Sequence, residues 1–273
     1  MGLDNRPLRM QSGALLQACH PAPAAAVTAL ATALAVSADA HPGRVALAFA
    51  TGQLSVGWSN DWVDAERDRA VHRADKPVVR GLPVSTVRTA ALLAAALCVP
   101  ASLSLGWRAG LAHLVAVASA WAYNLGLKAT VLSFAPYAVS FGLLPNVITL
   151  VRGQAAPWWA TAAGALLGIG AHAANVLPDL DDDARTGVRG LPQRLGRTGA
   201  TAVAALALLA ATLVLALGPG TSYVGSLGVL LALAAFGEGV RRGGRAVFLG
   251  VIAVAAVDVG MLLLRGARLT GHG

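Results

Sequence analysis

Residues 60–81 read N-D-W-V-D-A-E-R-D-R-A-V-H-R-A-D-K-P-V-V-R-G, and they concentrate charge in an otherwise apolar chain. Five acidic and five basic side chains lie within these 22 residues, whereas charged residues make up only 12% of the 273-residue sequence. A soluble domain usually carries about 25% charged residues, so this chain lacks the polar surface that water requires. We therefore expect an integral membrane protein in which this stretch is a polar loop.

Nine apolar segments account for most of the chain. They lie at 21–37, 41–59, 84–105, 107–124, 130–150, 157–177, 199–218, 222–237 and 245–265. A bilayer core needs about 20 apolar residues per helix, so the shorter segments are expected to tilt or to extend into flanking polar sequence. The sequence predicts one all-α membrane domain over residues 1–273, with nine transmembrane helices.

The basic residues predict the orientation. With a cytoplasmic N-terminus, 16 of the 21 Lys and Arg residues fall in cytoplasmic segments, as the positive-inside rule requires. Both acid-rich loops, which follow the second and sixth spans, then face the cytoplasm from a cell membrane. Basic loops explain the net charge of +8 without a nucleic-acid partner. Cys19 and Cys98 have no metal-site spacing.

The acids of the opening stretch share one direction if the second span continues into it as a helix. Asp61, Asp64 and Asp68 then fall within about 60° of arc, and Asn60 widens that arc to about 100°. Like charges on one helical face repel each other, so this arrangement favours a divalent cation in front of them. Glu66 points away from this face and is expected to be solvated.

A second cluster follows the sixth span. Residues 175–196 read N-V-L-P-D-L-D-D-D-A-R-T-G-V-R-G-L-P-Q-R-L-G, so Asn175, Asp179 and Asp183 recur every four residues. Pro178 is expected to kink or restart the helix at that point.

Two clusters of oxygen ligands without His or Cys favour Mg²⁺, which proteins bind through a few carboxylates and substrate phosphate oxygens. Basic residues stand beside both clusters and suit a polyanion: Arg73, Lys76, Arg80, Arg185, Arg189 and Arg194. The combination predicts a diphosphate on a lipid tail. Ordinary charged loops are the alternative, but they do not account for the same pattern occurring twice.

Two motifs resemble those of the UbiA-type intramembrane prenyltransferases: N-D-x-x-D-x-x-x-D at 60–68 and N-x-x-x-D-x-x-x-D at 175–183. The resemblance extends to the number of spans and to the cytoplasmic side of both loops, and so covers nearly the whole chain. It implies a bundle of nine transmembrane helices around a central cavity, in which the motif residues hold Mg²⁺ on the diphosphate of an allylic polyprenyl donor.

Carried over residue by residue, the resemblance implies the following site. The catalytic set is Asn60, Asp61, Asp64, Asp68, Asp179 and Asp183, and the five aspartates of this set are the expected metal ligands. The expected substrate-binding residues are Asn60, Arg73, Lys76, Tyr123, Lys128 and Asn175.

The sequence departs from the family pattern at two places. Pro178 stands where related sequences often have Arg, which removes one possible phosphate contact. The family often has Tyr-x-x-x-Lys after the fourth span, but Tyr123 and Lys128 are five residues apart, or about 140° on a regular helix. Either the turn is irregular, or Asn124 stands in.

Polar residues inside the apolar segments add weaker expectations. Asp258 lies well inside the ninth segment, where an acid is either functional or structurally paired. Asn146, next to Pro145, is expected to break the fifth span and to line the cavity. His113 and His172 are expected to form hydrogen bonds between helices.

The sequence therefore predicts a Mg²⁺-dependent prenyltransferase in the bilayer that moves a polyprenyl group from an allylic diphosphate to a hydrophobic acceptor, aromatic or lipid, and releases pyrophosphate. A membrane terpene cyclase of the same superfamily is the alternative, because both reactions begin with the same ionisation. A transporter is less favoured, since its acids usually lie near the bilayer midplane.

Overall fold

The computed structural model describes residues 8–270, and across them the chain forms α-helices joined by turns and by a longer loop over residues 71–83. The helices are α1 (Leu8–Ala18), α2 (Pro21–Ser37), α3 (Pro42–Val63), α4 (Ala65–Ala70), α5 (Val84–Leu103), α6 (Trp107–Leu125), α7 (Ala135–Val151), α8 (Trp158–Val176), α9 (Leu180–Arg185), α10 (Leu191–Leu217), α11 (Tyr223–Arg242) and α12 (Arg245–Leu264). Three 3₁₀ turns complete the list: η1 (Leu127–Ala129), η2 (Leu177–Asp179) and η3 (Gly266–Thr270).

Each of the nine predicted apolar segments coincides with one helix of the described chain: α2, α3, α5, α6, α7, α8, α10, α11 and α12. Five helices of this part are long and apolar enough to cross a bilayer, namely α5, α8 with η2, α10, α11 and α12. The bent pair formed by α1 and α2 raises the number to six. The predicted cytoplasmic N-terminus lies outside the described residues.

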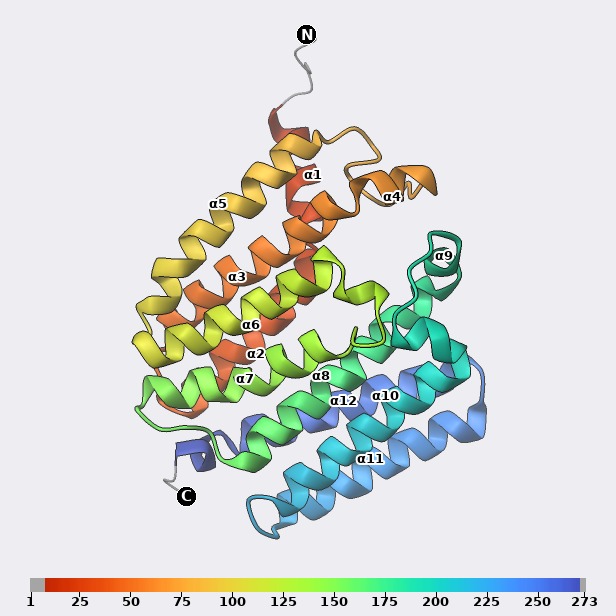
Figure 1. The fold of residues 1–273 in the computed structure, drawn as a ribbon. Helices are drawn as coiled ribbons and strands as arrows, with labels where there is room; N and C mark the ends of the chain where they lie inside the picture. The colour runs from red at the N-terminus through yellow and green to blue at the C-terminus, as the bar shows by residue number, and fades with distance from the viewer. Residues whose placement is uncertain (1–7, 271–273) are drawn as a thin grey trace.

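The long helices pack side by side in chain-neighbour pairs (Figure 1). Helix α3 packs on α2 and α5, α7 packs on α6 and α8, and α10 packs on α8, α11 and α12. Small residues allow close approaches: a Cβ added at Gly168 of α8 would lie 2.3 Å from the carbonyl oxygen of Tyr137 on α7. Gly168 therefore serves helix packing.

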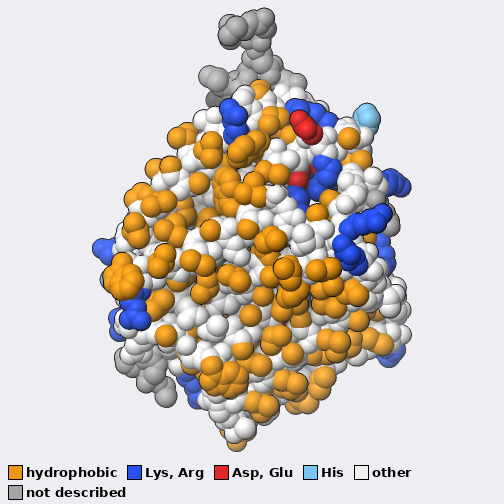
Figure 2. Space-filling view, viewed as in Figure 1, with side chains coloured by type: hydrophobic (Ala, Val, Ile, Leu, Met, Phe, Trp, Pro, Cys, Tyr) orange, Lys and Arg blue, Asp and Glu red, His pale blue; other side chains and the backbone are white. Residues whose placement is uncertain are grey.

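The outer surface is suited to lipid. Large aliphatic side chains are exposed along the bundle, for example Leu93 and Leu97 on α5, Leu206 on α10 and Leu230 on α11. Figure 2 shows hydrophobic side chains over most of one face, with acidic and basic side chains gathered near α4. Helices α4 and α9, which carry parts of the two aspartate motifs, lie at the same end of the bundle (Figure 1).

The predicted break in the fifth span is wrong. Helix α7 continues from Ala135 to Val151 with Pro145 inside it. Side chains supply polar contacts around the proline: Asn146 donates to the Gly142 carbonyl at 3.1 Å, and the Thr149 hydroxyl donates to the Pro145 carbonyl at 3.1 Å. Such local hydrogen bonds allow a membrane helix to tolerate proline without breaking.

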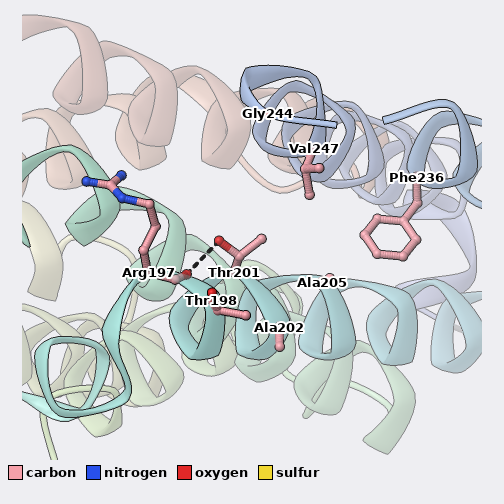
Figure 3. A pocket seen from close by; sticks show the side chains of 8 residues that line it. All are labelled: Arg197, Thr198, Thr201, Ala202, Ala205, Phe236, Gly244 and Val247. Atoms are coloured by element: carbon pink, nitrogen blue, oxygen red, sulfur yellow. Dashed lines mark hydrogen bonds between the residues drawn. The ribbon is translucent and has the colours of Figure 1, made fainter. Parts of the chain in front are cut away.

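Two adjoining pockets lie on the α10–α12 side of the bundle. One, of about 330 Å³, is lined by residues that include Thr201, Phe236 and Val247 (Figure 3). The second, of about 300 Å³, reaches Leu177 and Pro178 of η2. Neither pocket contains a residue of the first aspartate motif, so the central cavity stays a prediction.

Candidate active site

The first aspartate motif spans the junction of α3 and α4. Helix α3 ends at Val63 and α4 begins at Ala65, but helical hydrogen bonding continues through Asp64: its N–H donates to the Asn60 carbonyl at 3.0 Å, and its carbonyl accepts from the Asp68 N–H at 2.8 Å. The near-continuous helix keeps the acids in one direction.

Burial follows that direction. The side chains of Asp61, Asp64 and Asp68 are buried, whereas Glu66 is exposed, as the helical spacing predicts. A buried carboxylate requires charge partners or ligands. We therefore expect such partners for these three acids, whereas the exposed Glu66 carboxylate is solvated.

Asp64 is surrounded by three donors. Lys128 and Arg67 contact its carboxylate, the latter at 2.9 Å, and the Asn60 amide donates to it at 3.3 Å. Burial lowers the pKa of the Lys128 ammonium, although Asp64 opposes this effect. Asp64 and Lys128 therefore form a close ion pair between the first motif and the turn after α6.

The irregular turn that brings Lys128 to Asp64 follows from a glycine. Gly126 ends α6 with a φ of 152°, and η1 then carries Lys128. Asn124 takes part as well: its amide oxygen accepts from Asn60 at 3.2 Å, and its nitrogen donates to Ser59 Oγ at 2.8 Å. The turn is therefore irregular, which is the first of the two possibilities left open by the five-residue spacing, and whether Asn124 stands in stays a prediction. Tyr123 makes ring contacts with Tyr137 and His172, at centroid distances of 5.3 and 5.6 Å.

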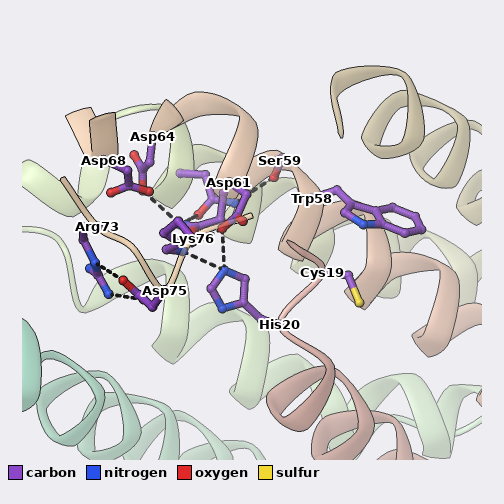
Figure 4. A network of polar contacts seen from close by, with 12 residues as sticks. Cys19, His20, Trp58, Ser59, Asp61, Asp64, Asp68, Arg73, Asp75 and Lys76 are labelled. Atoms are coloured by element: carbon purple, nitrogen blue, oxygen red, sulfur yellow. Dashed lines mark hydrogen bonds and ion pairs between the residues drawn. The ribbon is translucent and has the colours of Figure 1, made fainter. Parts of the chain in front are cut away.

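Asp61 makes different contacts from the other acids (Figure 4). Its Oδ1 lies 2.7 Å from Lys76 Nζ and 2.9 Å from His20 Nε2, and these two nitrogens are 3.1 Å apart. Lys76 is buried in the loop after α4, and His20 lies between α1 and α2. Sequence reasoning missed His20 because one histidine before an apolar helix is common. Its only signal is its place at the predicted cytoplasmic end of the first span.

The second motif does not lie on one helix. Asn175 is on α8, Asp179 ends η2 and Asp183 is on α9, because the helix restarts at Pro178 as expected. Asp183 accepts from Gln193 at 2.8 Å, and burial raises the pKa of its carboxyl. Asn175 is exposed and lies 3.5 Å from the Tyr137 hydroxyl.

An ion pair connects the loop after the first motif with the second motif. A guanidinium nitrogen of Arg73, in the loop after α4, lies 3.7 Å from Asp179 Oδ1. The same guanidinium binds Asp75 with hydrogen bonds of 3.1 and 3.3 Å. The two acid-rich loops, which are about a hundred residues apart in the sequence, therefore face each other.

The carboxylates meet part of what a divalent cation requires. Both oxygens of Asp68 and the Oδ2 of Asp61 are buried and have no hydrogen-bond partner in the described structure. Arg67 is 3.8 Å from Asp68, too far for a hydrogen bond, and burial raises the pKa of the Asp68 carboxyl. Hard oxygen donors in this condition suit Mg²⁺.

The described side chains do not gather the expected metal ligands into one cluster. Within residues 8–270, no group of three or more His, Cys, Asp or Glu side chains is placed to hold a metal ion. Basic side chains stand between the acids instead, with Lys128 and Arg67 on Asp64 and Arg73 near Asp179.

Comparison with known proteins gives consistent matches. The profile of the UbiA prenyltransferase family matches residues 22–257. No curated protein shows a significant match to the sequence. Among solved structures, a UbiA homologue from Archaeoglobus fulgidus bound to GPP and Mg²⁺ has a TM-score of 0.71 at 15% identity, covering 94% of this chain and 99% of its own.

Two further structures agree with the first. A digeranylgeranylglyceryl phosphate synthase has a TM-score of 0.70 at 13% identity, over 95% of this chain and 100% of its own. The apo UbiA homologue from Aeropyrum pernix K1 has a TM-score of 0.66 at 18% identity, over 89% of this chain and 96% of its own. At these identities the structures establish a shared fold, and the family profile covers most of the sequence. The chain therefore belongs to the UbiA prenyltransferase family.

Proposed function

We propose that this protein transfers a polyprenyl group within the bilayer from an allylic diphosphate to a hydrophobic acceptor, aromatic or lipid, and releases pyrophosphate. The observation that carries the proposal is the 3.7 Å contact between Arg73 and Asp179, which brings the two acid-rich loops to one place. The A. fulgidus homologue supports it, since its structures hold GPP or DMAPP together with Mg²⁺, and another holds Cd²⁺.

The carboxylates proposed to hold Mg²⁺ are Asp64, Asp68, Asp179 and Asp183. The unpartnered oxygens of Asp68 support its part in this set. Asp61 is the fifth expected ligand, and its Oδ2 has no partner in the described structure. We leave it out of this set because Lys76 and His20 both bind its Oδ1. The bound metal would supply Lewis-acid stabilisation of the diphosphate oxygens.

The bases proposed to bind the diphosphate are Arg73, Lys76 and Lys128. Arg73 faces Asp179 of the second motif, and Lys76 and Lys128 face Asp61 and Asp64 of the first, so the two motifs both lie beside these cations. Asn60, Tyr123 and Asn175 remain candidate substrate contacts from the sequence. A diphosphate brought to these cations would be stabilised as charge develops on the leaving oxygen.

The reaction proceeds by breaking the allylic C–O bond, and the electron pair leaves with the diphosphate. The allylic cation is then captured by an electron-rich atom of the acceptor, which loses a proton where the new bond replaces one to hydrogen. Apolar walls protect the cation from water. In a cyclase, by contrast, an alkene of the donor itself would capture the cation.

The proposed setting is a cell membrane. We propose nine spans in one domain over residues 1–273, with both motifs on the cytoplasmic side. The positions of α2 to α12 and the excess of basic residues in the proposed cytoplasmic segments support this topology.

Purified protein in detergent tests the proposal with GPP, Mg²⁺ and a panel of aromatic and lipid acceptors, by measuring pyrophosphate release and prenylated product. Excess EDTA should abolish release, and added Mg²⁺ or Mn²⁺ should restore it. Product only with an acceptor supports transfer, and product without one indicates cyclisation. Full turnover in excess EDTA would contradict the proposed metal dependence.

A further inference from the structure

The junction of α1 and α2, residues 15–20, forms an elbow beside the first aspartate motif. The two helices are bent by 64°, and His20 ends the elbow with a φ of 55°. A positive φ is uncommon for a residue other than glycine, and it persists only where the surroundings fix it. The elbow is therefore held by its contacts.

The elbow lies against α3 at backbone distance. A Cβ added at Gly57 would come within 2.1 Å of the Cys19 carbonyl oxygen. One helical position further along, Trp58 Nε1 donates to the Leu15 carbonyl at 2.8 Å. Only glycine allows this approach, so the sequence at 57 is suited to the elbow.

The elbow also packs on the loop that carries Lys76. Ala18 belongs to one buried apolar cluster with Val78 and Leu82 of that loop. The Arg80 guanidinium binds the side chain of Gln17. The loop and the elbow thus share an apolar contact and a polar one.

At the centre of this arrangement, Asp61 Oδ1, Lys76 Nζ and His20 Nε2 form a triangle (Figure 4). Nε2 carries either a proton or a lone pair, so it either donates to Asp61 or accepts from Lys76. In both cases Lys76 donates to Asp61, and the imidazole fixes the position of the pair. An ammonium has three N–H groups, so at least one remains for a phosphate oxygen.

We propose that His20 and Asp61 are positioning residues that hold the Lys76 ammonium ready for the donor diphosphate, and that the N-terminal elbow is part of the donor site. The inference rests on the proposed function, because it takes Lys76 as a diphosphate contact. In this inference Asp61 holds the Lys76 ammonium in place and is not a metal ligand. Holding a long side chain in place before binding reduces the entropy lost when the ligand arrives.

The first test separates the imidazole from the backbone at residue 20. His20→Gly keeps the left-handed turn and removes the ring, and His20→Gln restores a polar group of similar reach. With full-length protein in detergent at saturating Mg²⁺, the Kd of inorganic pyrophosphate should rise about 10-fold in His20→Gly, within the range for outer contacts of a site. It should return to within about threefold of wild type in His20→Gln. An unchanged Kd in His20→Gly, or equal weakening in both variants, would overturn the proposal.

The second test moves the elbow without touching a charged side chain. Gly57→Ala should raise the pyrophosphate Kd by a similar factor, and adding His20→Gly should weaken it little further, because both changes disturb one contact. The matched control is Gly43→Ala on the same helix, where a Cβ meets no atom within 4 Å. Independent effects of Gly57→Ala and His20→Gly would contradict a shared role.

The third test distinguishes positioning from metal ligation. At saturating Mg²⁺, Asp61→Asn should weaken pyrophosphate binding about 10-fold. The Mg²⁺ concentration at half-maximal pyrophosphate binding should stay within about twofold of wild type in Asp61→Asn, while Asp64→Asn should raise it. A shift as large in Asp61→Asn as in Asp64→Asn would make Asp61 a metal ligand and overturn the assignment. Because these readouts need no turnover, a wild type that binds pyrophosphate but releases none from GPP would refute the proposed function and leave this inference intact.

Discussion

Arg73 and Asp179 lie 3.7 Å apart and bring the two acid-rich loops into contact. Arg73 follows the first motif and Asp179 belongs to the second, so each loop supplies a charge to the other. A base between two acidic loops can pass from a carboxylate to a diphosphate oxygen without losing its charge partner. In the proposed function, Arg73 would exchange Asp179 for a diphosphate oxygen when the donor binds.

Replacing Arg73 should weaken donor binding more than turnover. Arg73→Gln removes a charged donor, and a hydrogen bond to a charged group is worth about 1.5–3 kcal/mol, or roughly 10- to 100-fold in kcat/KM for GPP. We expect most of the loss in KM, since the contact is made with both the ground and the transition state. Steady-state rates of pyrophosphate release at varied GPP concentrations give both kcat and KM.

Asp75→Asn is the matched control for Arg73→Gln. Asp75 binds the same guanidinium, but its side chain is 63% exposed. An exposed ion pair contributes little, so the KM should change less than about threefold. A larger loss in Asp75→Asn than in Arg73→Gln would show that the loop conformation matters more than the Arg73 charge.

Substitution of Asp64 should lower kcat far more than substitution of Glu66, although the two residues are only two positions apart. Asp64 is buried among Lys128, Arg67 and Asn60, whereas Glu66 is exposed. Asp64→Asn should lower kcat by about 10²–10³, the usual cost of losing one electrostatic contact in an active site. Glu66→Gln should change it less than about threefold. Equal losses would mean that the total charge of the loop matters, and not its buried face.

Cysteine labelling tests the orientation. Cys19 and Cys98 are buried and would first be replaced. In that background, Asp75→Cys and Arg185→Cys should react with an impermeant maleimide only from the cytoplasmic side. Gln154→Cys, at an exposed position between α7 and α8, should react only from outside intact cells. Labelling of residue 75 or 185 from outside would contradict the topology.

The sequence predicted the positions of the long helices and the direction of the first motif well. Apolar length locates the nine long helices α2, α3, α5 to α8 and α10 to α12 because each bundle helix needs one apolar stretch. Helical spacing separates Asp64 from Glu66 because α3 and α4 are nearly continuous. His113 does bind a hydroxyl on a neighbouring helix, that of Ser102 on α5 at 2.7 Å, whereas His172 binds Ser133 in the turn before α7 at 3.0 Å.

The Asp258 carboxylate also has a partner, since it accepts from the Thr212 hydroxyl on α10 at 2.6 Å. This contact pairs two helices and accounts for the acid structurally. Its other oxygen is buried without a hydrogen bond in the described chain, so the functional alternative is left as a hypothesis.

Other features of the candidate site depend on contacts between distant residues, and the spacing of residues along the sequence does not predict such contacts. The elbow that brings His20 to Asp61 requires a glycine at 57 and a turn at residue 20, and neither has a periodic signal. The second motif is spread over α8, η2 and α9, so its four-residue period does not make one stripe. The pairing of Asp64 with Lys128 depends on the irregular turn at Gly126.

The central claim is that both aspartate motifs of this UbiA-family prenyltransferase serve one metal–diphosphate site. The most direct measurement is the rate of pyrophosphate release from GPP for Asp64→Asn, Asp179→Asn and the double variant, at saturating Mg²⁺. Each single change should lower the rate by about 10²–10³. The double variant should lose much less than the product of the two, as residues that act as a unit do. Losses that multiply fully, or an Asp179→Asn variant as active as the wild type, would contradict a shared site.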